Sequence, residues 1–258
     1  MSTSIVESLH NIPAKNHQLP MTLKQPSLQP GFRLEVASPD DMPEIWQVYA
    51  AAFEEDEVWP GLFRDVVNPA EIYPWICTNF APRLNFPDII TYKITEDASG
   101  AIAGWTALQI PWKYLHPSVM TDELKAQVTK KELPPPLPGM DVESLADAYR
   151  TMGGSKLYGY DPENDYHRRG TMIRPDMQRK GFGSFLTQYC NQIVDHTGDR
   201  LWTRSRPSSQ KMFRQNEFVE VGRLDSHHER WGGTREKSIT YILLHSPPCV
   251  SMGKDPMI

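Results

Sequence analysis

The stretch from Gly170 to Asn191 restricts the possible folds of this chain more than any other segment. A short β-type run ends at Pro175, the glycines Gly181 and Gly183 follow, and apolar residues then recur at helical spacing. This order predicts a strand, a glycine turn and the start of a helix. The backbone N–H groups from Arg179 to Ser184 would lie at the N-terminus of that helix, where they have no partner within it.

Such a turn is suited to an anion such as a pyrophosphate. Unpaired N–H donors and the positive end of the helix macrodipole attract negative charge. Gly181 and Gly183 have no Cβ, so a ligand can approach the backbone closely. Arg179 and Lys180 add two cations beside the turn. Taken alone, these residues leave an ordinary strand-to-helix turn without a ligand as the alternative.

The turn resembles motif A of the GNAT superfamily of acyl-CoA-dependent N-acyltransferases. In that motif a Gln or Arg stands three residues after a strand-ending proline, with Gly three residues later and Gly or Ala two residues after that. Pro175, Gln178, Gly181 and Gly183 fit every position. The resemblance implies an acetyl-CoA site and no metal. The implied cofactor-binding residues are Ile173, Arg174, Gln178, Arg179, Lys180, Gly181, Phe182, Gly183, Ser184 and Arg214.

The rest of the chain predicts an α/β (α+β) fold with a mixed, largely antiparallel twisted sheet flanked by helices. Alternating or continuous apolar runs predict strands at 32–36, 89–95, 101–110, 201–205, 218–224 and 239–244. Helices are predicted from Ser38, which is a good N-cap, and at 207–216. The resemblance further implies that the sheet opens between its fourth and fifth strands.

We predict one domain, 31–246, between a flexible N-terminal tail, 1–30, and a C-terminal tail, 247–258. The N-terminal tail is rich in Pro, Ser, Gln and Asn and shows no period. Segment 111–165 is predicted as a helical insertion before the fourth core strand, with helices near 121–132 and 141–152 separated by prolines. The insertion is interpreted as a lid or pocket wall, and packing without substrate contact is the alternative.

Composition and charge argue against several functions. A net charge of −5 disfavours binding of nucleic acid through phosphate neutralisation. Three cysteines without a CxxC pair or metal spacing indicate neither a zinc site nor a disulfide framework. The N-terminus lacks the apolar core of a signal peptide, and no run approaches the length of a membrane span. We therefore expect a cytoplasmic protein without nucleic-acid or membrane partners, while its oligomeric state stays open.

Acyl transfer from a thioester to an amine requires a base, a positioned carbonyl and donors for the oxyanion. The resemblance implies backbone donors at Ile173 and Arg174. It also places a general base about eight residues before the proline, where this chain has His167. An imidazole can act as a base at neutral pH, so His167 is the first catalytic candidate and Asp165 the second. A polar strand-edge residue without a catalytic role is the alternative for His167.

Four further features bear on function. Phe213 stands where the family's leaving-group tyrosine is usual, and it has no proton to give to a thiolate. Arg168 and Arg169 point to opposite faces of a strand, so one of them could bind a carboxylate of the acceptor or pair with the acidic insertion. The acidic run 54–57 could attract a cationic acceptor or form a solvated loop. The tract 227–230 contains two adjacent histidines, which we interpret as solvent-facing rather than as a metal site.

The sequence therefore indicates an acetyl-CoA-dependent N-acetyltransferase that acts on a primary amine of a small molecule through a direct ternary complex. One alternative is a CoA-binding protein with little or no turnover, because Phe213 replaces a tyrosine and position 167 is not a glutamate. The other is an acetyltransferase of protein N-termini or lysines.

Overall fold

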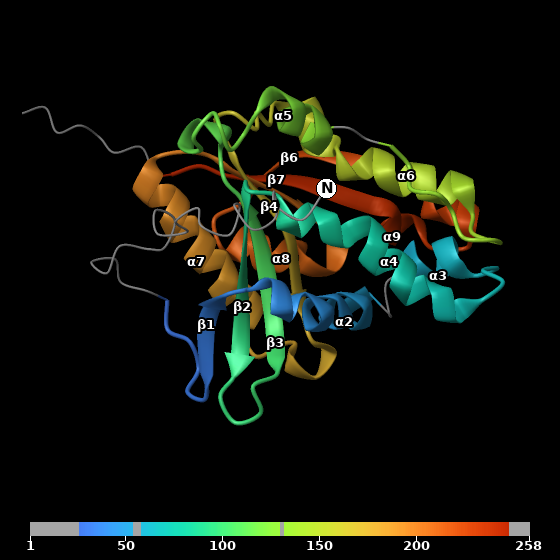
Figure 1. Cartoon of the computed structure of the whole chain (residues 1–258), viewed down its shortest axis with the longest axis horizontal. Coiled ribbons are helices and arrows are strands. Elements are labelled where there is room, and N and C mark those ends of the chain that lie inside the picture. Colours follow the sequence, from blue (N-terminus) through green and yellow to red (C-terminus); the bar gives the residue numbers. More distant parts are fainter. Residues whose placement is uncertain (1–25, 54–57, 130–131, 248–258) are drawn as a thin grey trace, which may run out of the picture.

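A computed structural model describes residues 26–53, 58–129 and 132–247. Its strands form one seven-stranded sheet in the order β1-β2-β3-β4-β5-β7-β6. Neighbouring strands are antiparallel except β4 and β5, which are parallel. The predicted mixed, largely antiparallel sheet is therefore confirmed (Figure 1). The strands are β1 (Phe32–Val36), β2 (Ile89–Glu96), β3 (Ile102–Gln109), β4 (Tyr166–Ile173), β5 (Leu201–Ser205), β6 (Val219–Asp225) and β7 (Ile239–His245).

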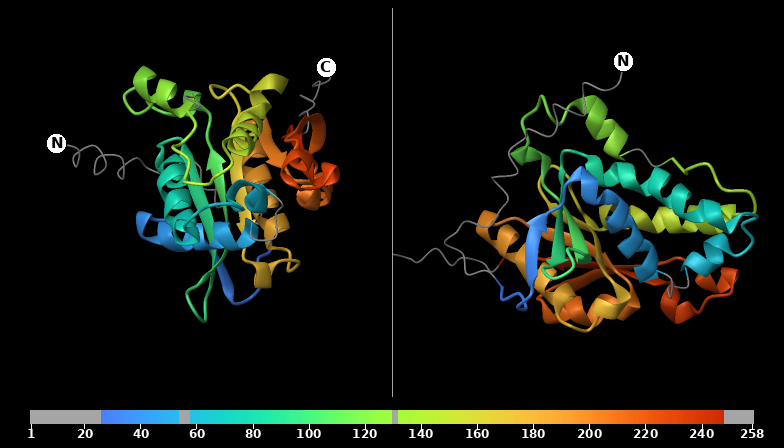
Figure 2. Two further views of the ribbon diagram at one scale, coloured as in Figure 1. Left: turned by 90° about the vertical axis from the view of Figure 1, so that its right-hand side faces the viewer. Right: turned by 60° about the horizontal axis from the view of Figure 1, so that its bottom comes forward.

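Helices cover both faces of the sheet. The helix α2 packs on β3 through Ile45 and Trp105, whereas α7 packs on the opposite face through Leu186 and Ile94. Figure 2 shows the blue and teal N-terminal helices on one side of the sheet and the gold and orange helices on the other. The helices are α2 (Met42–Phe53), α3 (Val58–Phe63), α4 (Ile72–Phe80), α5 (Asp122–Thr129), α6 (Val142–Met152), α7 (Phe182–Thr197), α8 (Pro207–Gln215) and α9 (Arg235–Ser238).

The insertion contains α5 and α6, close to the two helices predicted there. Asp141 caps α6 by accepting a hydrogen bond of 2.8 Å from the backbone N–H of Ser144. The proline-rich segment between the helices packs against α4, where Trp75 Nε1 donates to the carbonyl of Pro135 at 2.7 Å. Figure 1 shows both helices along one end of the sheet. The insertion is thus attached to the domain on the α4 side.

The sheet opens between β4 and β5. These strands pair only at Tyr166 with Leu201 and at His167 with Trp202. Beyond these two positions β4 continues against β3 alone, and β5 continues against β7 alone. One edge of β4 is therefore without a strand partner, as the resemblance implied.

Several predicted segments lie outside the described residues. These are most of the tail 1–30, the acidic run 54–57 and nearly all of the tail 247–258. Within the described part of the first tail, Leu28 packs on the cluster around Phe182, and the side chain of Gln29 donates to the carbonyl of Lys180. The folded part therefore begins before position 31. No helix in the described ranges is long and apolar enough to span a bilayer.

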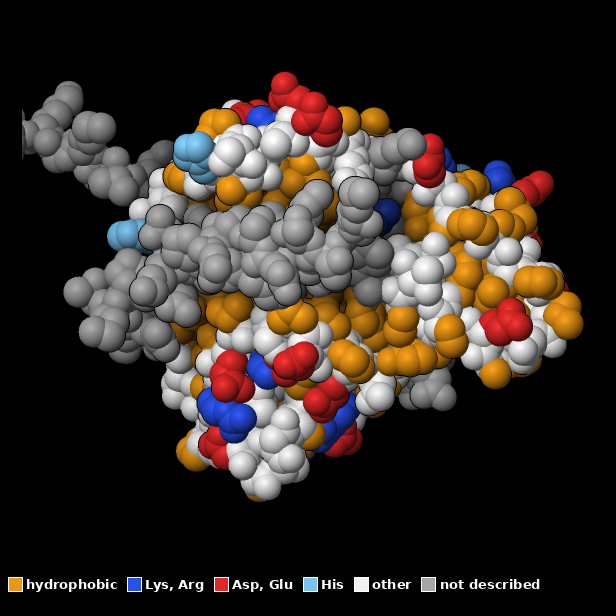
Figure 3. Space-filling view, in the orientation of Figure 1, with side chains coloured by type: hydrophobic (Ala, Val, Ile, Leu, Met, Phe, Trp, Pro, Cys, Tyr) orange, Lys and Arg blue, Asp and Glu red, His pale blue; other side chains and the backbone are white. Residues whose placement is uncertain are grey.

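The surface seen in Figure 3 has two contrasting parts. Hydrophobic side chains gather over α3 and α4. At the ends of β1 to β3, charges of both signs alternate and pair, as in Arg33 with Asp97 at 2.8 Å and Lys93 with Asp41 at 2.5 Å. Charge is therefore locally balanced at that end of the sheet.

The contact between α7 and the sheet can be tested by truncating Leu186, which is fully buried. We expect Leu186→Ala to lower the free energy of unfolding by about 2–5 kcal/mol, because it removes apolar contacts and leaves a cavity. Urea denaturation would measure this change. The control Leu157→Ala alters a side chain that is 75% exposed and should stay within about 0.5 kcal/mol of wild type. Equal losses in the two variants would contradict the packing described.

Candidate active site

A cavity of about 780 Å³ lies at the opening between β4 and β5. Its walls come from β4, β5, α2, the first turns of α7 and α8, and the insertion. Side chains of the insertion such as Thr151, Ser155 and Tyr160 line one end, and Gln178 and Gly183 line the other. The cavity thus connects the insertion with the glycine turn.

The glycine turn presents unpaired donors. Gly181 is the N-cap of α7 with a φ of 87°, and Arg179 also has a positive φ of 63°. The first hydrogen bond that closes the helix runs from the N–H of Phe185 to the carbonyl of Gly181 at 2.9 Å. Within the described part of the chain, no backbone N–H from Arg179 to Ser184 donates to another residue. Unpaired N–H donors at the positive end of a helix macrodipole attract anions.

The predicted cofactor-binding residues divide into two groups. Ile173, Gln178, Arg179 and Gly183 line the cavity. The side chains of the others lie elsewhere: that of Phe182, for example, is buried against Phe32, with ring centres 4.7 Å apart. Those of them that belong to the glycine turn could bind a ligand only through their backbone N–H groups. The predicted residues outside the lining are Arg174, Lys180, Gly181, Phe182, Ser184 and Arg214.

Two of these predicted residues have partners within the protein. The N–H of Arg174 donates to the carbonyl of Ala103 at 2.9 Å, so it cannot also serve as a donor in the cavity. The side chain of Arg214 pairs with Glu220 at 2.8 Å instead of reaching the cavity. The Arg174 N–H is therefore not available as a donor to the cavity, whereas a cofactor role of the Arg214 side chain stays a prediction.

The direction of the Arg174 N–H identifies the groups that do face the opening. In an antiparallel ladder, successive N–H groups point to alternate sides. The register from Gly104↔Ile173 to Thr106↔Thr171 is regular, so the N–H groups of Ile173 and Thr171 both point away from β3. Both residues line the cavity. The sequence analysis did not single out Thr171, because its orientation depends on this register.

His167 lies inside the cavity wall with only 1% of its surface exposed. Its Nδ1 lies 2.8 Å from the carbonyl of Arg168, which can only accept, so Nδ1 carries the proton of the neutral ring. Its Nε2 then accepts from the hydroxyl of Ser155 at 2.9 Å. Burial lowers the pKa of His167 well below its usual value, and the cations Arg169 and Arg204 lower it further. The imidazole is therefore neutral at neutral pH.

The Asp165 carboxylate is held by hydrogen bonds from neighbouring side chains. Its two oxygens accept from Arg200 at 2.8 and 2.9 Å, and Oδ2 also accepts from Trp202 Nε1 at 3.0 Å. It is 2% exposed and is not part of the cavity lining. These partners hold the Asp165 oxygens away from the cavity, so the geometry favours His167 over Asp165, and the catalytic role of Asp165 stays a prediction.

A carboxylate that the sequence analysis did not single out does line the cavity. Asp88 is fully buried, and its Oδ2 accepts from Gln109 Nε2 at 2.5 Å and from Trp112 Nε1 at 2.8 Å. Its Oδ1 has no hydrogen-bond partner among the described residues. Position 88 directly precedes β2, and nothing local in the sequence distinguishes this aspartate from a turn residue.

Phe213 and Arg168 meet on the α8 side of the cavity. Phe213 is 4% exposed, and the Arg168 guanidinium lies 5.1 Å from its ring centre. Arg168 donates to Thr187 Oγ1 at 2.6 Å and to Thr106 Oγ1 at 3.2 Å. The structure thus places no acidic proton at position 213, and the Arg168 side chain is occupied by hydroxyl groups.

Arg169 and Arg204 lie on the insertion side. Arg169 donates through Nε to Gln109 Oε1 at 2.7 Å, and its guanidinium lies 5.8 Å from the ring centre of Tyr160. Arg204 donates through Nη1 to the carbonyl of Thr151 at 3.3 Å, while its buried Nε has no partner among the described residues. Neither arginine forms an ion pair within the described ranges, so the predicted pairing of Arg169 with an acidic insertion is not found there.

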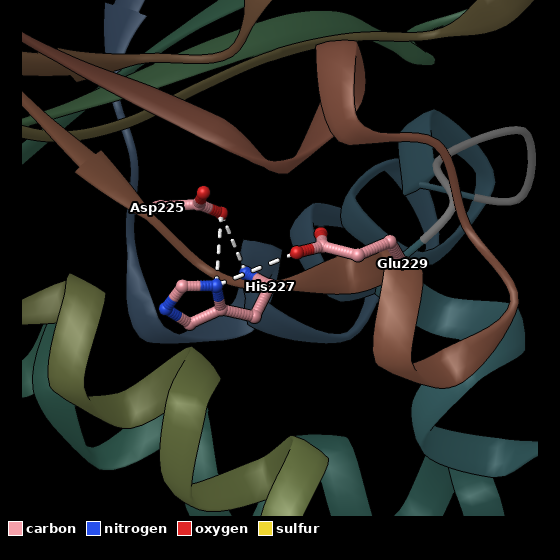
Figure 4. A group of neighbouring side chains, drawn as sticks. All are labelled: Asp225, His227 and Glu229. Carbon is pink, nitrogen blue, oxygen red and sulfur yellow. Dashed lines mark hydrogen bonds and ion pairs between the residues drawn. The ribbon is translucent and has the colours of Figure 1, made fainter.

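The tract with two adjacent histidines has a different arrangement from the one predicted. Ligand atoms of Asp225, His227 and Glu229 lie within 4.8 Å of one another (Figure 4). His227 Nδ1 lies 3.6 Å from Asp225 and 3.5 Å from Glu229, which suits ion pairs when the imidazole is protonated. His228 is buried, not solvent-facing, and its N–H donates to Ser238 Oγ at 2.8 Å.

Comparison with known proteins supports the fold. No protein-family model and no curated protein matches the sequence. Among solved structures, arylalkylamine N-acetyltransferase 2 from Aedes aegypti is similar with a TM-score of 0.57 and 12% identity, over 84% of this chain and 99% of that one. Histone acetyltransferase HPA2 and related acetyltransferase from Corynebacterium glutamicum is similar with a TM-score of 0.50 and 11% identity, over 86% and 99%. The chain therefore has the GNAT fold.

Because His167 is neutral in the folded protein, we expect the free energy of unfolding to depend on pH. The unfolded chain gains a proton at this residue below its usual pKa near 6.5, whereas the folded protein does not, because its folded-state pKa is lowered. Stability should therefore fall with acidification in that window, by about 1.4 kcal/mol per pH unit from this group. Urea unfolding at pH 7.5 and 5.5 should show a steeper loss for wild type than for His167→Gln. Equal losses would contradict the assignment.

Proposed function

We propose that the protein is an acyl-CoA-dependent N-acyltransferase that moves an acetyl group from acetyl-CoA to the primary amine of a small molecule. The observation that carries this proposal is the row of unpaired N–H groups from Arg179 to Ser184, which lies at one end of the cavity. A pyrophosphate matches such a helix N-terminus in charge and hydrogen bonding. The acetyltransferase names of the similar structures support the same chemistry.

The open edge of β4 suits the rest of the donor. Thr171 and Ile173 direct N–H groups away from β3 and toward the opening. A pantetheine arm carries amides that can pair with such an edge in the manner of an added strand. One of these N–H groups would then stabilise the oxyanion of the thioester carbonyl. We retain Ile173 as a donor and add Thr171, which lies closer to His167 along the strand.

The proposed transfer forms one C–N bond and breaks one C–S bond. The lone pair of the acceptor amine attacks the thioester carbonyl carbon and forms the new C–N bond. The C–S bond then breaks, and its electron pair leaves with the thiolate. One proton is lost from the amine and one is gained by the thiolate, so that the products are an N-acetylated amine and free CoA. Holding both substrates in one cavity supplies the proximity that this reaction needs.

For the proton lost from the amine, we propose a route through Ser155 to His167. The Ser155 hydroxyl lines the cavity and donates to His167 Nε2, so it can pass a proton inward when it receives one. For the thiolate, Phe213 supplies no proton. Ser209 lies one helical turn before Phe213 and lines the cavity, and we propose this hydroxyl or a water molecule as the proton source.

A small acceptor agrees better with the cavity than a protein chain does. Residues from β4, β5, α2 and the insertion surround the acceptor end, including Tyr149, Thr151 and Tyr160 of the insertion. Enclosure on these sides leaves less room for an extended peptide than an open groove. This argument supports a small molecule over a protein N-terminus or lysine.

A CoA-binding protein with little turnover is the second candidate. Two observations favour it: Phe213 carries no acidic proton, and the lowered pKa makes His167 a weak base. Binding of acetyl-CoA is common to both candidates, whereas release of the thiol occurs only in the first.

The function can be tested by calorimetric titration of acetyl-CoA followed by a thiol-release assay with amines, amino acids and peptides. We expect binding and an amine-dependent release of free CoA, because the turn and the open strand edge would hold the donor beside the acceptor cavity. Binding without release from any acceptor would favour the second candidate. Failure to bind would show that the glycine turn is not a CoA site.

The location of the donor site can be tested with two matched glycines of α7. Gly181 at its N-terminus and Gly198 at its C-terminus both have positive φ, and neither has an atom within 4 Å of an added Cβ. Tryptophan at either position strains the backbone to a similar degree. We expect Gly181→Trp to weaken acetyl-CoA binding at least about tenfold, since it obstructs the N–H groups. Gly198→Trp should leave Kd within about twofold, and equal Kd values in both variants would contradict the site.

A further inference from the structure

The cavity is cationic in a chain that is acidic overall. Its described lining contains seven Arg and Lys residues but only two carboxylates, Asp88 and Glu132, whereas the whole chain has a net charge of −5. Some of these cations are accounted for: Arg179 belongs to the glycine turn, and Arg168 is held by threonine hydroxyls. The remaining question is what the cations at the insertion end bind.

Arg204 is the cation with the least compensation. It lies on β5, its Nε is buried without a partner among the described residues, and its Nη1 has one contact of 3.3 Å to the Thr151 carbonyl. Burial, together with repulsion from Arg169 and Arg83, lowers the pKa of Arg204 to about 9. Arg204 is still protonated at neutral pH. A half-buried cation among other cations is unfavourable unless an anion joins it.

Arg169 is positioned to share such an anion. Its Nε is fixed by Gln109 Oε1, and that same oxygen accepts from the Tyr160 hydroxyl at 2.9 Å. Gln109 in turn donates to Asp88, so Asp88 lies behind Gln109 in this hydrogen-bond chain and forms no ion pair with Arg169. The two Nη groups of Arg169 have no hydrogen bond in the described part of the chain. A guanidinium fixed at Nε presents these groups in a defined direction.

We propose that Arg169 and Arg204 bind the carboxylate of the acceptor, which makes the acceptor an amino acid or a related amino carboxylate. This inference rests on the proposed acyltransferase function and specifies its substrate class. The guanidinium groups come from β4 and β5, the two strands that diverge at the cavity. A carboxylate between them gains charge-assisted hydrogen bonds from both, and the repulsion between the arginines is relieved.

The rest of the acceptor end agrees with an amino acid. Besides the arginines, its lining is rich in aromatic rings, which can pack against an apolar side chain. The strand positions place the arginines to one side of the Thr171 and Ile173 N–H groups, so an acceptor anchored by its carboxylate can direct its amine toward the thioester. The aromatic lining residues on this side are Trp46, Tyr49, Trp105, Trp112, Tyr149 and Tyr160.

The proposal can be tested with matched pairs of ligands: each common amino acid and its carboxamide, which keeps the amine but removes the carboxylate. Binding is measured by calorimetry and thermal shift in the presence of saturating CoA, which fills the donor site without reacting. Thiol release from acetyl-CoA is measured on the same pairs. We expect at least one amino acid to exceed its amide by about tenfold to a hundredfold in Kd and in kcat/KM.

Variants locate the effect. Arg204→Gln and Arg169→Gln should abolish the preference for the carboxylate while leaving the Kd of acetyl-CoA within about twofold. Arg204→Lys should retain only part of it, because a lysine lacks the planar fork. Arg150→Gln serves as the control, since Arg150 is exposed on α6, pairs with Asp147 and lies outside the cavity lining. Removal of one half-buried cation that is repelled by its neighbours should not lower Tm, so loss of folding does not obscure the result.

The outcomes separate this proposal from the proposed function. If no amino acid binds better than its amide, the carboxylate site is wrong even when other amines are acetylated. Equal preference in wild type and Arg204→Gln overturns it too, as does stabilisation by inorganic phosphate but not by any carboxylate. If CoA binds and thiol release never occurs, the acyltransferase function fails, and the binding comparison still decides the carboxylate site.

Discussion

The divergence of β4 from β5 after two paired positions is the constraint on which the rest of the structure depends. It leaves backbone N–H groups of β4 facing the interior of the molecule without a strand partner. Unpaired buried N–H groups are costly, so such an edge persists where a ligand or water pairs with it. The neighbouring elements accommodate the opening: α7 begins at one end of it, and the insertion encloses the other. The sheet thereby leaves part of one strand edge unpaired beside the cavity, which is the basis of the proposed donor site.

The opening is lined mainly by cations, although the chain as a whole is acidic. The chain carries more acidic than basic residues, yet the cavity collects cations from β4, β5 and the segment after α4. At the end of the sheet near β1, acidic and basic residues pair with each other, as Lys93 does with Asp41. Arg169 and Arg204 have no such pairs within the described residues. This contrast supports the proposal that Arg169 and Arg204 bind an external anion.

Local sequence signals were sufficient for most of the fold. The ends of β1 and β5 coincide with the predicted runs, and the capping residue Ser38 was identified correctly. The turn around Gly181 was visible because glycine and helical periodicity act over a few residues. The residues that line the acceptor end of the cavity could not be predicted from such local signals. Asp88 and Arg204 line the cavity because segments distant in the sequence pack together. No neighbouring residue in the sequence marks either of them as part of a site.

The register of β4 determines which of its N–H groups and side chains face the cavity, and the sequence does not show this register. It also places Arg169 near His167. The bulge between Ala107 and Leu108 shifts the register of β4, which sets the directions of the N–H groups and side chains beyond it. Arg169 occupies the extra position at that bulge and lies on the same side as His167, where it lowers the pKa of the imidazole together with Arg204. A carboxylate bound to both arginines would cancel this repulsion, although the effect of burial would remain. Binding of an amino carboxylate would thus raise the pKa of His167 toward its usual value and strengthen the base only when the acceptor is in place.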